Sequence, residues 1–163
     1  MQCLPELKDY LLSKVLFWPM GNNNLPLTPG NLLLELKLLS IDDSVLAKKI
    51  TSELNEMTRA WQTKWADRCT QEMIARTRSW AEVSEEPKEL TEATYRNDIR
   101  NRAIITLLQQ QPGVTSDTIT LSNLDAKIKK CLMNGPFVWP EQYSSLIDQS
   151  TYWFLYQTIN RKG

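Results

Sequence analysis

The sequence contains no histidine and no surplus of either charge. Histidine is the commonest general acid or base in proteins and the commonest metal ligand. Its absence excludes Ser-His-Asp hydrolase triads, zinc sites with His ligands and Glu-x-x-His di-iron bundles. The 19 Lys and Arg residues balance 19 Asp and Glu residues, so no overall field draws the chain onto nucleic acid or an anionic membrane.

Cysteine is also scarce, and the chain lacks a long apolar run. Cys3, Cys69 and Cys131 are far apart and match no metal-binding spacing, so we expect them to act as small hydrophobic side chains. No apolar run approaches the roughly 20 residues that cross a bilayer, and the opening segment lacks the basic start of a secretory signal. We therefore expect a cytoplasmic protein with no membrane partner, no metal and no cofactor.

The residues that are present form an ordinary globular composition. The 163 residues predict one domain, spanning residues 1–163, with a core that needs neither disulfides nor metal. Hydrophobic residues make up 42% of the chain and charged residues 23%, so disorder is not expected. Tryptophan is unusually frequent, with six copies, and large rings of this kind suit both cores and contact surfaces.

Glycine and proline are concentrated in a few short segments, and neither occurs between Gly30 and Pro87. This distribution predicts an all-α, single-domain bundle of about five or six helices. Thr28 provides an N-cap hydroxyl before a Leu-rich helix that begins at Pro29. The other shorter helices are expected at about 5–16, 90–110, 122–133 and 140–149.

One long central helix is expected over about 42–83, with a possible break whose position the pattern does not give. Its apolar positions, with Arg76 filling one gap, recur about every 3.7 residues, close to the 3.6 of a straight helix and above the 3.5 of a heptad coil. Pro87 is expected to end it. The apolar positions are Leu46, Ile50, Leu54, Met57, Trp61, Trp65, Cys69, Met73, Trp80 and Val83.

Two later segments are harder to interpret from the pattern. Ser122 and Asp125 have the spacing of a capping box, which places a helix start at Ser122, and 113–121 is expected to be a loop with a short extended piece near Val114 and Ile119. Aromatic residues crowd 137–156, and this segment is expected to dock on the long helix. The residues at 150–160 fit either a helix or a strand.

A charged ladder interrupts the apolar face of the long helix. At about 100° per residue, Arg68, Glu72 and Arg76 fall on the same side as Trp61. Each charge lies four residues from the next, so Glu72 can pair with either arginine. Burying an unpaired charge costs several kcal/mol, so this ladder needs an explanation.

Three explanations are open. The first is an internal Arg-Glu-Arg triad that fixes how the helices register. The second is a polar cleft in which the guanidinium groups bind a small anion or a carboxylate, walled by Trp61, Trp65 and Trp80. The third is a stripe that faces solvent or a second subunit. Arg102 and Tyr95 share a face of the following helix and are expected to join the ladder.

The resulting hypothesis is a non-enzymatic helical interaction or structural protein in a homo-oligomer or larger assembly, with a protein partner or self-association. An alternative is a small anion-binding module, or less favoured a nucleic-acid-binding one, that uses the Arg-rich region 59–102, which holds seven of the eight arginines. An enzyme using Glu72 is less favoured still, because flanking arginines keep a carboxylate ionised and weaken it as a base.

Overall fold

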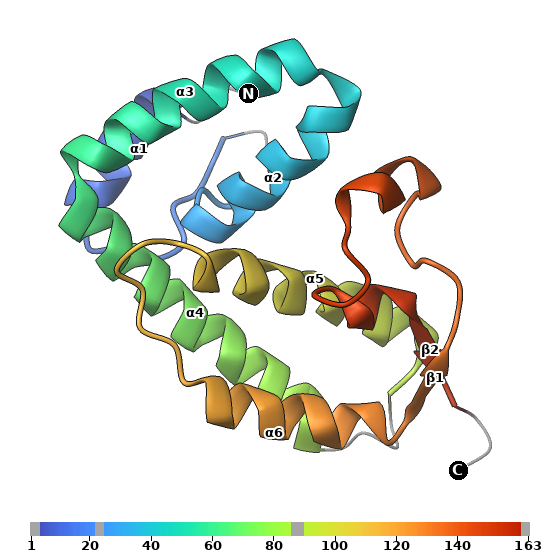
Figure 1. Cartoon of the computed structure of the whole chain (residues 1–163). Helices are drawn as coiled ribbons and strands as arrows, with labels where there is room; N and C mark the ends of the chain where they lie inside the picture. Colours follow the sequence, from blue (N-terminus) through green and yellow to red (C-terminus); the bar gives the residue numbers. More distant parts are fainter. Residues whose placement is uncertain (1–3, 22–24, 86–89, 161–163) are drawn as a thin grey trace. The chain divides into compact units, whose positions relative to one another are not determined.

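Helices dominate the structure, a computed structural model that describes residues 4–21, 25–85 and 90–160 (Figure 1). The predicted all-α class is confirmed, since the sheet consists of two three-residue strands. Cys3 and Pro87, for which the sequence predicted a structural role and a helix end, lie outside the described residues.

The chain divides into two compact units. Unit 1 comprises residues 1–73 and 107–115, and unit 2 comprises residues 74–106 and 116–163. Two helices, α4 (Gln62–Glu85) and α5 (Glu92–Gln109), contribute residues to both units. The single domain over residues 1–163 stays a prediction.

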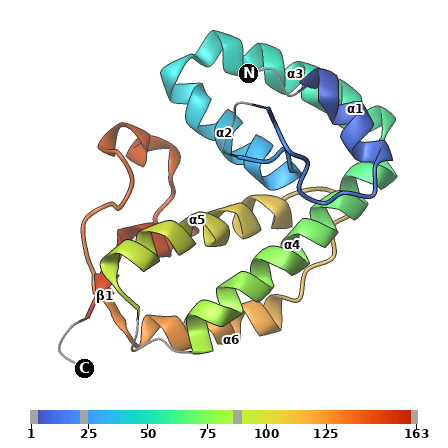
Figure 2. The same ribbon diagram turned by 180° about the vertical axis from the view of Figure 1, so that it is seen from behind.

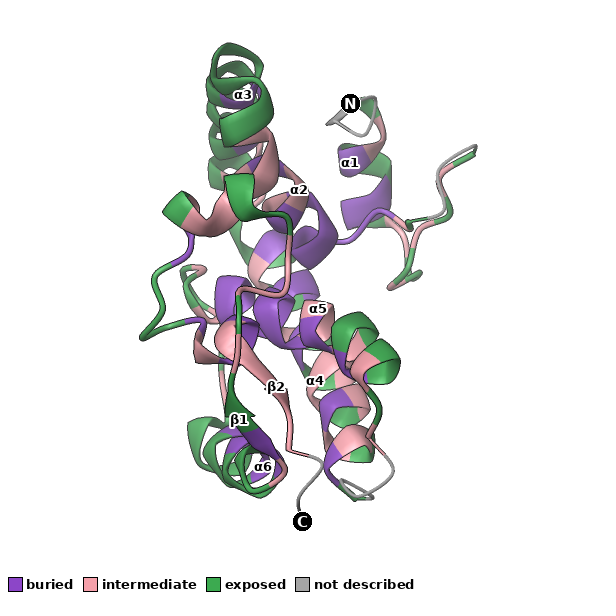
Figure 3. Ribbon diagram, turned by 90° about the vertical axis from the view of Figure 1, so that its right-hand side faces the viewer, coloured by how far each residue is buried: buried purple, intermediate pink, exposed green. Residues whose placement is uncertain are grey.

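Unit 1 begins with α1 (Leu4–Leu12), α2 (Pro29–Asp42) and α3 (Ser44–Ala60). The Thr28 side chain accepts a hydrogen bond from the Asn31 N–H, which confirms the predicted N-cap of α2. Asp43 ends α2 and caps α3, so these two helices pack as a hairpin with a very short connection. Figure 3 colours much of α2 as buried, in agreement with its buried Leu32, Leu34 and Leu36.

The long helical region is present but interrupted at Trp61. The backbone there has φ −120° and ψ 34°, and α3 ends before this residue while α4 begins after it. This is the break whose position the sequence did not give, because no glycine or proline marks it. The predicted apolar positions Trp65, Cys69, Met73 and Trp80 are buried, whereas Leu46 is exposed, at the start of α3.

Unit 2 contains the second part of α4, most of α5, and α6 (Thr118–Lys129), followed by β1 (Leu132–Asn134) and β2 (Gln157–Ile159). The strands are antiparallel, with Met133 opposite Thr158. Its core includes buried side chains from all three helices and from the C-terminal segment: Trp80, Tyr95, Ile99, Ala103, Leu121, Leu124, Ile128, Phe154 and Leu155.

The sequence placed the start of α6 too late. Asp117, rather than Ser122, caps this helix, because its side chain accepts a hydrogen bond from the Thr120 N–H at 2.9 Å. The extended piece expected near Val114 and Ile119 is therefore wrong: Val114 lies in a loop and Ile119 in the first turn of α6.

The aromatic C-terminal segment docks on α5, while its predicted docking on the long helix stays a prediction. It comprises the 3-10 helices η2 (Glu141–Leu146) and η3 (Trp153–Tyr156), followed by β2. Phe154 is fully buried, and its carbonyl accepts a hydrogen bond from the Tyr95 hydroxyl of α5. The 150–160 segment thus combines the two conformations that the sequence left open, a helical turn and a strand.

Candidate functional site

Glu72 lies at the centre of a buried polar group in unit 1, and its carboxylate meets the N-terminus of α2. The side chain is fully buried. Its Oε1 accepts a hydrogen bond from the Thr28 hydroxyl at 2.6 Å, and its Oε2 accepts one from the Gly30 N–H at 2.7 Å. The first N–H groups of a helix have no partner within the helix and lie at the positive end of its dipole. A carboxylate here is therefore stabilised by the start of α2.

Arg68, one turn earlier on α4, lies at the C-terminus of α1. Its guanidinium donates hydrogen bonds to the carbonyls of Tyr10 and Ser13, at the C-terminus of α1, and to the Gln71 side chain. It also lies 5.2 Å from the centre of the Tyr10 ring. Cations are favourable at a helix C-terminus, where the last carbonyls lack partners. One turn of α4 thus places a cation at the end of α1 and an anion at the start of α2.

Burial and this carboxylate change the acidity of two neighbouring groups. Burial raises the pKa of the Tyr10 hydroxyl well above its ordinary value, and the negative charge of Glu72 raises it further. The pKa of the buried Cys69 thiol is raised by the same two causes in the same order. Cys69 is therefore protonated at neutral pH and is not a nucleophile.

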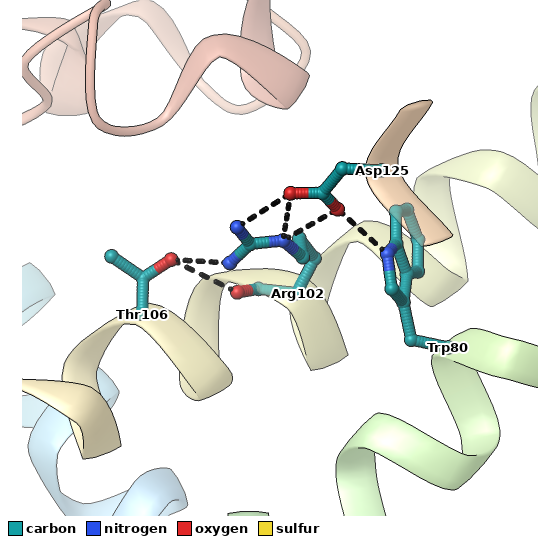
Figure 4. A network of polar contacts seen from close by, with 4 residues as sticks. All are labelled: Trp80, Arg102, Thr106 and Asp125. Atoms are coloured by element: carbon teal, nitrogen blue, oxygen red, sulfur yellow. Dashed lines mark hydrogen bonds and ion pairs between the residues drawn. The ribbon is translucent and has the colours of Figure 1, made fainter. Parts of the chain in front are cut away.

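A second polar cluster lies in unit 2 around Asp125 of α6 (Figure 4). Arg102 of α5 donates from Nε to Oδ1 at 3.0 Å and from Nη2 to Oδ2 at 2.9 Å, which gives a bidentate pair. The Trp80 Nε1 donates to Oδ1 at 2.9 Å, and the remaining Arg102 nitrogen donates to the Thr106 hydroxyl at 2.7 Å. A buried salt bridge joins Arg102 to Asp125. The one expected from the sequence was a triad of Arg68, Glu72 and Arg76, which stays a prediction.

Tyr95 completes this region through the C-terminal segment. Its hydroxyl donates to the Phe154 carbonyl at 2.7 Å, and the Arg102 guanidinium lies 5.0 Å from the centre of the Phe154 ring. Burial raises the pKa of Tyr95 well above its ordinary value, with further contributions from the charges of Glu92 and Asp125. This phenol is a hydrogen-bond donor inside the fold and remains protonated at neutral pH.

The predicted site residues divide between the two units. Trp61, Trp65, Arg68 and Glu72 belong to unit 1, whereas Arg76, Trp80, Tyr95 and Arg102 belong to unit 2. Arg76 donates to the Asn101 side chain at 2.6 Å. Of the three tryptophans expected to wall the site, Trp80 contacts Asp125, Trp65 is buried with its Nε1 on the Gln111 side chain, and Trp61 is half-buried at the helix break.

Sequence reasoning missed Asp125, the acceptor that joins Arg102 to Trp80. A signal for it was available. Leu121, Asp125, Ile128 and Leu132 follow one another at spacings of four, three and four, so this carboxylate interrupts an apolar stripe just as Glu72 does. The partners of Glu72 gave a weaker signal, because Thr28 was identified as a helix cap and Gly30 carries no side chain.

The described residues contain neither a metal-binding cluster nor a helix that could span a membrane. Within residues 4–21, 25–85 and 90–160, no group of three or more Cys, Asp or Glu side chains is arranged to hold a metal ion. No helix in that part of the chain is both long enough and apolar enough to span a bilayer.

Fold and clusters together define an all-α protein whose buried charges are bound by helix ends and by one another. Comparison of the chain with protein-family models, with curated protein sequences and with solved structures gave no match in any of the three. The function is therefore inferred from the residues and their contacts.

Proposed function

We propose that the chain is a non-enzymatic helical interaction protein that works in a homo-oligomer or a larger assembly. The observation that carries this proposal is that the side chains best suited to catalysis or anion binding form hydrogen bonds inside the fold. Both carboxylate oxygens of Glu72 accept hydrogen bonds, and the guanidinium of Arg102 is bound to Asp125 and Thr106. A general base or an anion receptor needs groups that its substrate can reach.

Exposed apolar side chains on the outer surface also support an interaction function. Several large apolar side chains are highly exposed, led by Val45 at 79% and Ile119 at 75%. Association would remove such side chains from water, which is favourable. Those that exceed half exposure are Leu12, Val45, Ile74 and Ile119, and Met133 reaches 50%.

The alternatives are disfavoured by the same contacts. Anion or nucleic-acid binding through Arg68 and Arg102 would have to break hydrogen bonds to backbone carbonyls or to Asp125. Catalysis by Glu72 would require an exposed carboxylate, and this one is 0% exposed. Arg78 and Arg96 are exposed, so a double variant, Arg78→Ala with Arg96→Ala, tests the nucleic-acid alternative. Oligonucleotide binding that weakens steeply with added salt and is lost in this variant would support that alternative.

The experiment that tests this proposal is the mass of the full chain in solution. We expect sedimentation velocity, over about 1 to 500 µM, to show a mass that rises above the 18.9 kDa of one chain. The monomer mass at every concentration would contradict the proposal. Glu72→Gln serves as a control, because the proposal assigns this residue to folding and not to association.

A further inference from the structure

A single residue, Trp61, interrupts what is otherwise one helix from Ser44 to Glu85. Helical hydrogen bonds reach this residue from both sides. The Trp61 N–H donates to the Met57 carbonyl at 3.0 Å, and the Trp65 N–H donates to the Trp61 carbonyl at 2.9 Å. A change in the backbone angles of Trp61, from φ −120° and ψ 34° to helical values, would therefore join α3 and α4.

The sequence around Trp61 suits a continuous helix. The two helices contain no glycine and no proline, which are the usual causes of a sharp bend. Apolar residues continue across the bend at helical spacings of three and four, and these residues are Leu54, Met57, Trp61 and Trp65. A continuous helix would also pair the first N–H groups of α4 with the last carbonyls of α3, which lack partners within their own helices. The cause of the bend therefore lies in tertiary contacts.

Contacts between α4 and the start of α2 require the bend. The Thr28 hydroxyl and the Gly30 N–H donate to the Glu72 carboxylate at 2.6 and 2.7 Å. Because α2 and α3 form a hairpin, the start of α2 lies beside the end of α3. In a continuous helix, Glu72 would lie 12 residues beyond Ala60, about 18 Å further along the axis. One copy can therefore make these contacts only with the bend that Figures 1 and 2 show between α3 and α4.

We propose that α3 and α4 join into one helix at Trp61 and that two copies of the chain exchange the segments before this residue. Thr28 and Gly30 of each copy then meet Glu72 of the other copy. This inference rests on the proposed function and names its partner, a second copy of the chain. Exchange of an identical segment between two copies gives a closed pair that reuses the buried contacts of the bent chain.

The exchanged pair differs from two separate copies mainly at the hinge. Each buried contact that opens within a chain closes between two chains, so its contribution to the association free energy cancels. Glu72→Gln should therefore lower the stability of the chain without changing its association constant. The backbone hydrogen bonds gained at the junction favour the pair, and the lost freedom of two separate copies opposes it, so the pair forms at high concentration.

The first test compares Trp61→Ala with Trp61→Gly. Both variants remove the same indole ring, but alanine favours a helical backbone over glycine by a factor of about five. The exchanged pair contains two such hinges, so Trp61→Ala should self-associate about 20-fold more tightly than Trp61→Gly in sedimentation velocity. Equal association constants would overturn the exchange. Circular dichroism of each variant establishes that it is folded.

The matched control is the same pair of substitutions at Glu53, an exposed position in the middle of α3. This residue is helical both in the bent chain and in the exchanged pair. Glu53→Ala and Glu53→Gly should therefore differ in unfolding free energy but have the same association constant. A difference in association as large as that at Trp61 would show that the hinge is not special, which overturns the exchange.

The second test locates the contact between copies in the unmodified chain. Equal amounts of ¹³C-labelled and unlabelled chain, unfolded together in urea and refolded at high concentration, give mixed pairs. Isotope-filtered magnetic resonance should then show a nuclear Overhauser effect between the Thr28 methyl group of one copy and the Glu72 side chain of the other. A mixed pair in which Thr28 meets Glu72 only within one copy would overturn the exchange.

The outcomes separate this inference from the proposed function. Self-association of the unmodified chain, with equal association constants for Trp61→Ala and Trp61→Gly, would overturn the exchange and leave the proposed function standing. A monomer at every concentration of the unmodified chain would contradict both.

Discussion

The two units bury charge in different ways. In unit 1, Arg68 and Glu72 meet the ends of α1 and α2, and their partners include backbone carbonyls, a backbone N–H and a capping hydroxyl. In unit 2, Arg102 is held mainly by the opposite charge of Asp125. A buried ion needs an opposite charge or oriented dipoles; helix ends contribute such dipoles in unit 1, and Asp125 supplies an opposite charge in unit 2. A charged residue on an apolar helix face is therefore not by itself a sign of a binding site.

The largest effect is expected for removal of Asp125. Asp125→Ala leaves the buried Arg102 guanidinium without its counter-charge and the Trp80 N–H without its acceptor, which should cost about 3–5 kcal/mol of unfolding free energy. Urea unfolding followed by circular dichroism measures this cost. Arg102→Leu combined with Asp125→Leu should be far less destabilising, since no buried charge remains. A double variant as unstable as Asp125→Ala would contradict this account of the pair.

Neutralising the charge in unit 1 is expected to have a smaller effect. Glu72→Gln keeps the shape but places an amide N–H₂ group against the Thr28 hydroxyl or the Gly30 N–H, which should cost about 1–3 kcal/mol. The exposed Glu82 on the same helix provides the control, because Glu82→Gln should change stability by less than about 0.5 kcal/mol. A double-mutant cycle with Thr28→Val measures the coupling, and additive effects would disprove a direct interaction.

The two buried tyrosines predict a loss of stability in alkali. The pKa of Tyr10 and of Tyr95 is raised in the folded chain, so above pH 10 the unfolded chain loses these protons while the folded chain retains them. The two tyrosines should therefore leave the unfolding free energy unaffected below pH 9 and lower it above pH 10, by about 1.4 kcal/mol each at pH 11. This fall adds to the one that the buried Cys69 thiol, whose pKa is also raised, causes from about pH 8.5. Tyr95→Phe and Tyr10→Phe should each remove the decrease in unfolding free energy that its own tyrosine causes. An unchanged pH profile in either variant would refute its assignment.

The smallest effect is expected for a change that keeps the charge at the end of α1. Arg68→Lys retains a cation but loses the planar group that reaches the Tyr10 and Ser13 carbonyls together, so we expect a loss of about 1 kcal/mol. Thermal unfolding measures this loss. Arg78→Lys, at an exposed position of the same helix, should have no measurable effect in that experiment. Equal stabilities for the two variants would show that the guanidinium geometry at position 68 is unimportant.

Local patterns predicted most of the helical framework. The spacing of apolar residues located α2, α3, α4 and α5, and Thr28 marked a helix start, because these features depend on neighbouring residues. The position of the break at Trp61 and the strand β1 were not predicted, and for β2 the sequence left helix and strand open. No glycine or proline marks the break, and each strand is only three residues long.

The site was predicted in its members but not in its partners. Arg68, Glu72, Trp80, Tyr95 and Arg102 are buried, yet their contacts come from residues distant in sequence. Glu72 binds groups 44 and 42 residues away, and Arg102 binds Asp125, 23 residues away. Periodicity shows which face a charge occupies, but tertiary packing determines which group meets it.

The central claim is that the buried charges hold the fold and contribute nothing net to association. The self-association constant of Glu72→Gln, measured by sedimentation beside the unmodified chain under conditions where both chains are folded, tests this claim most directly. We predict that the two chains associate with the same constant. Weakened association of folded Glu72→Gln would contradict the account.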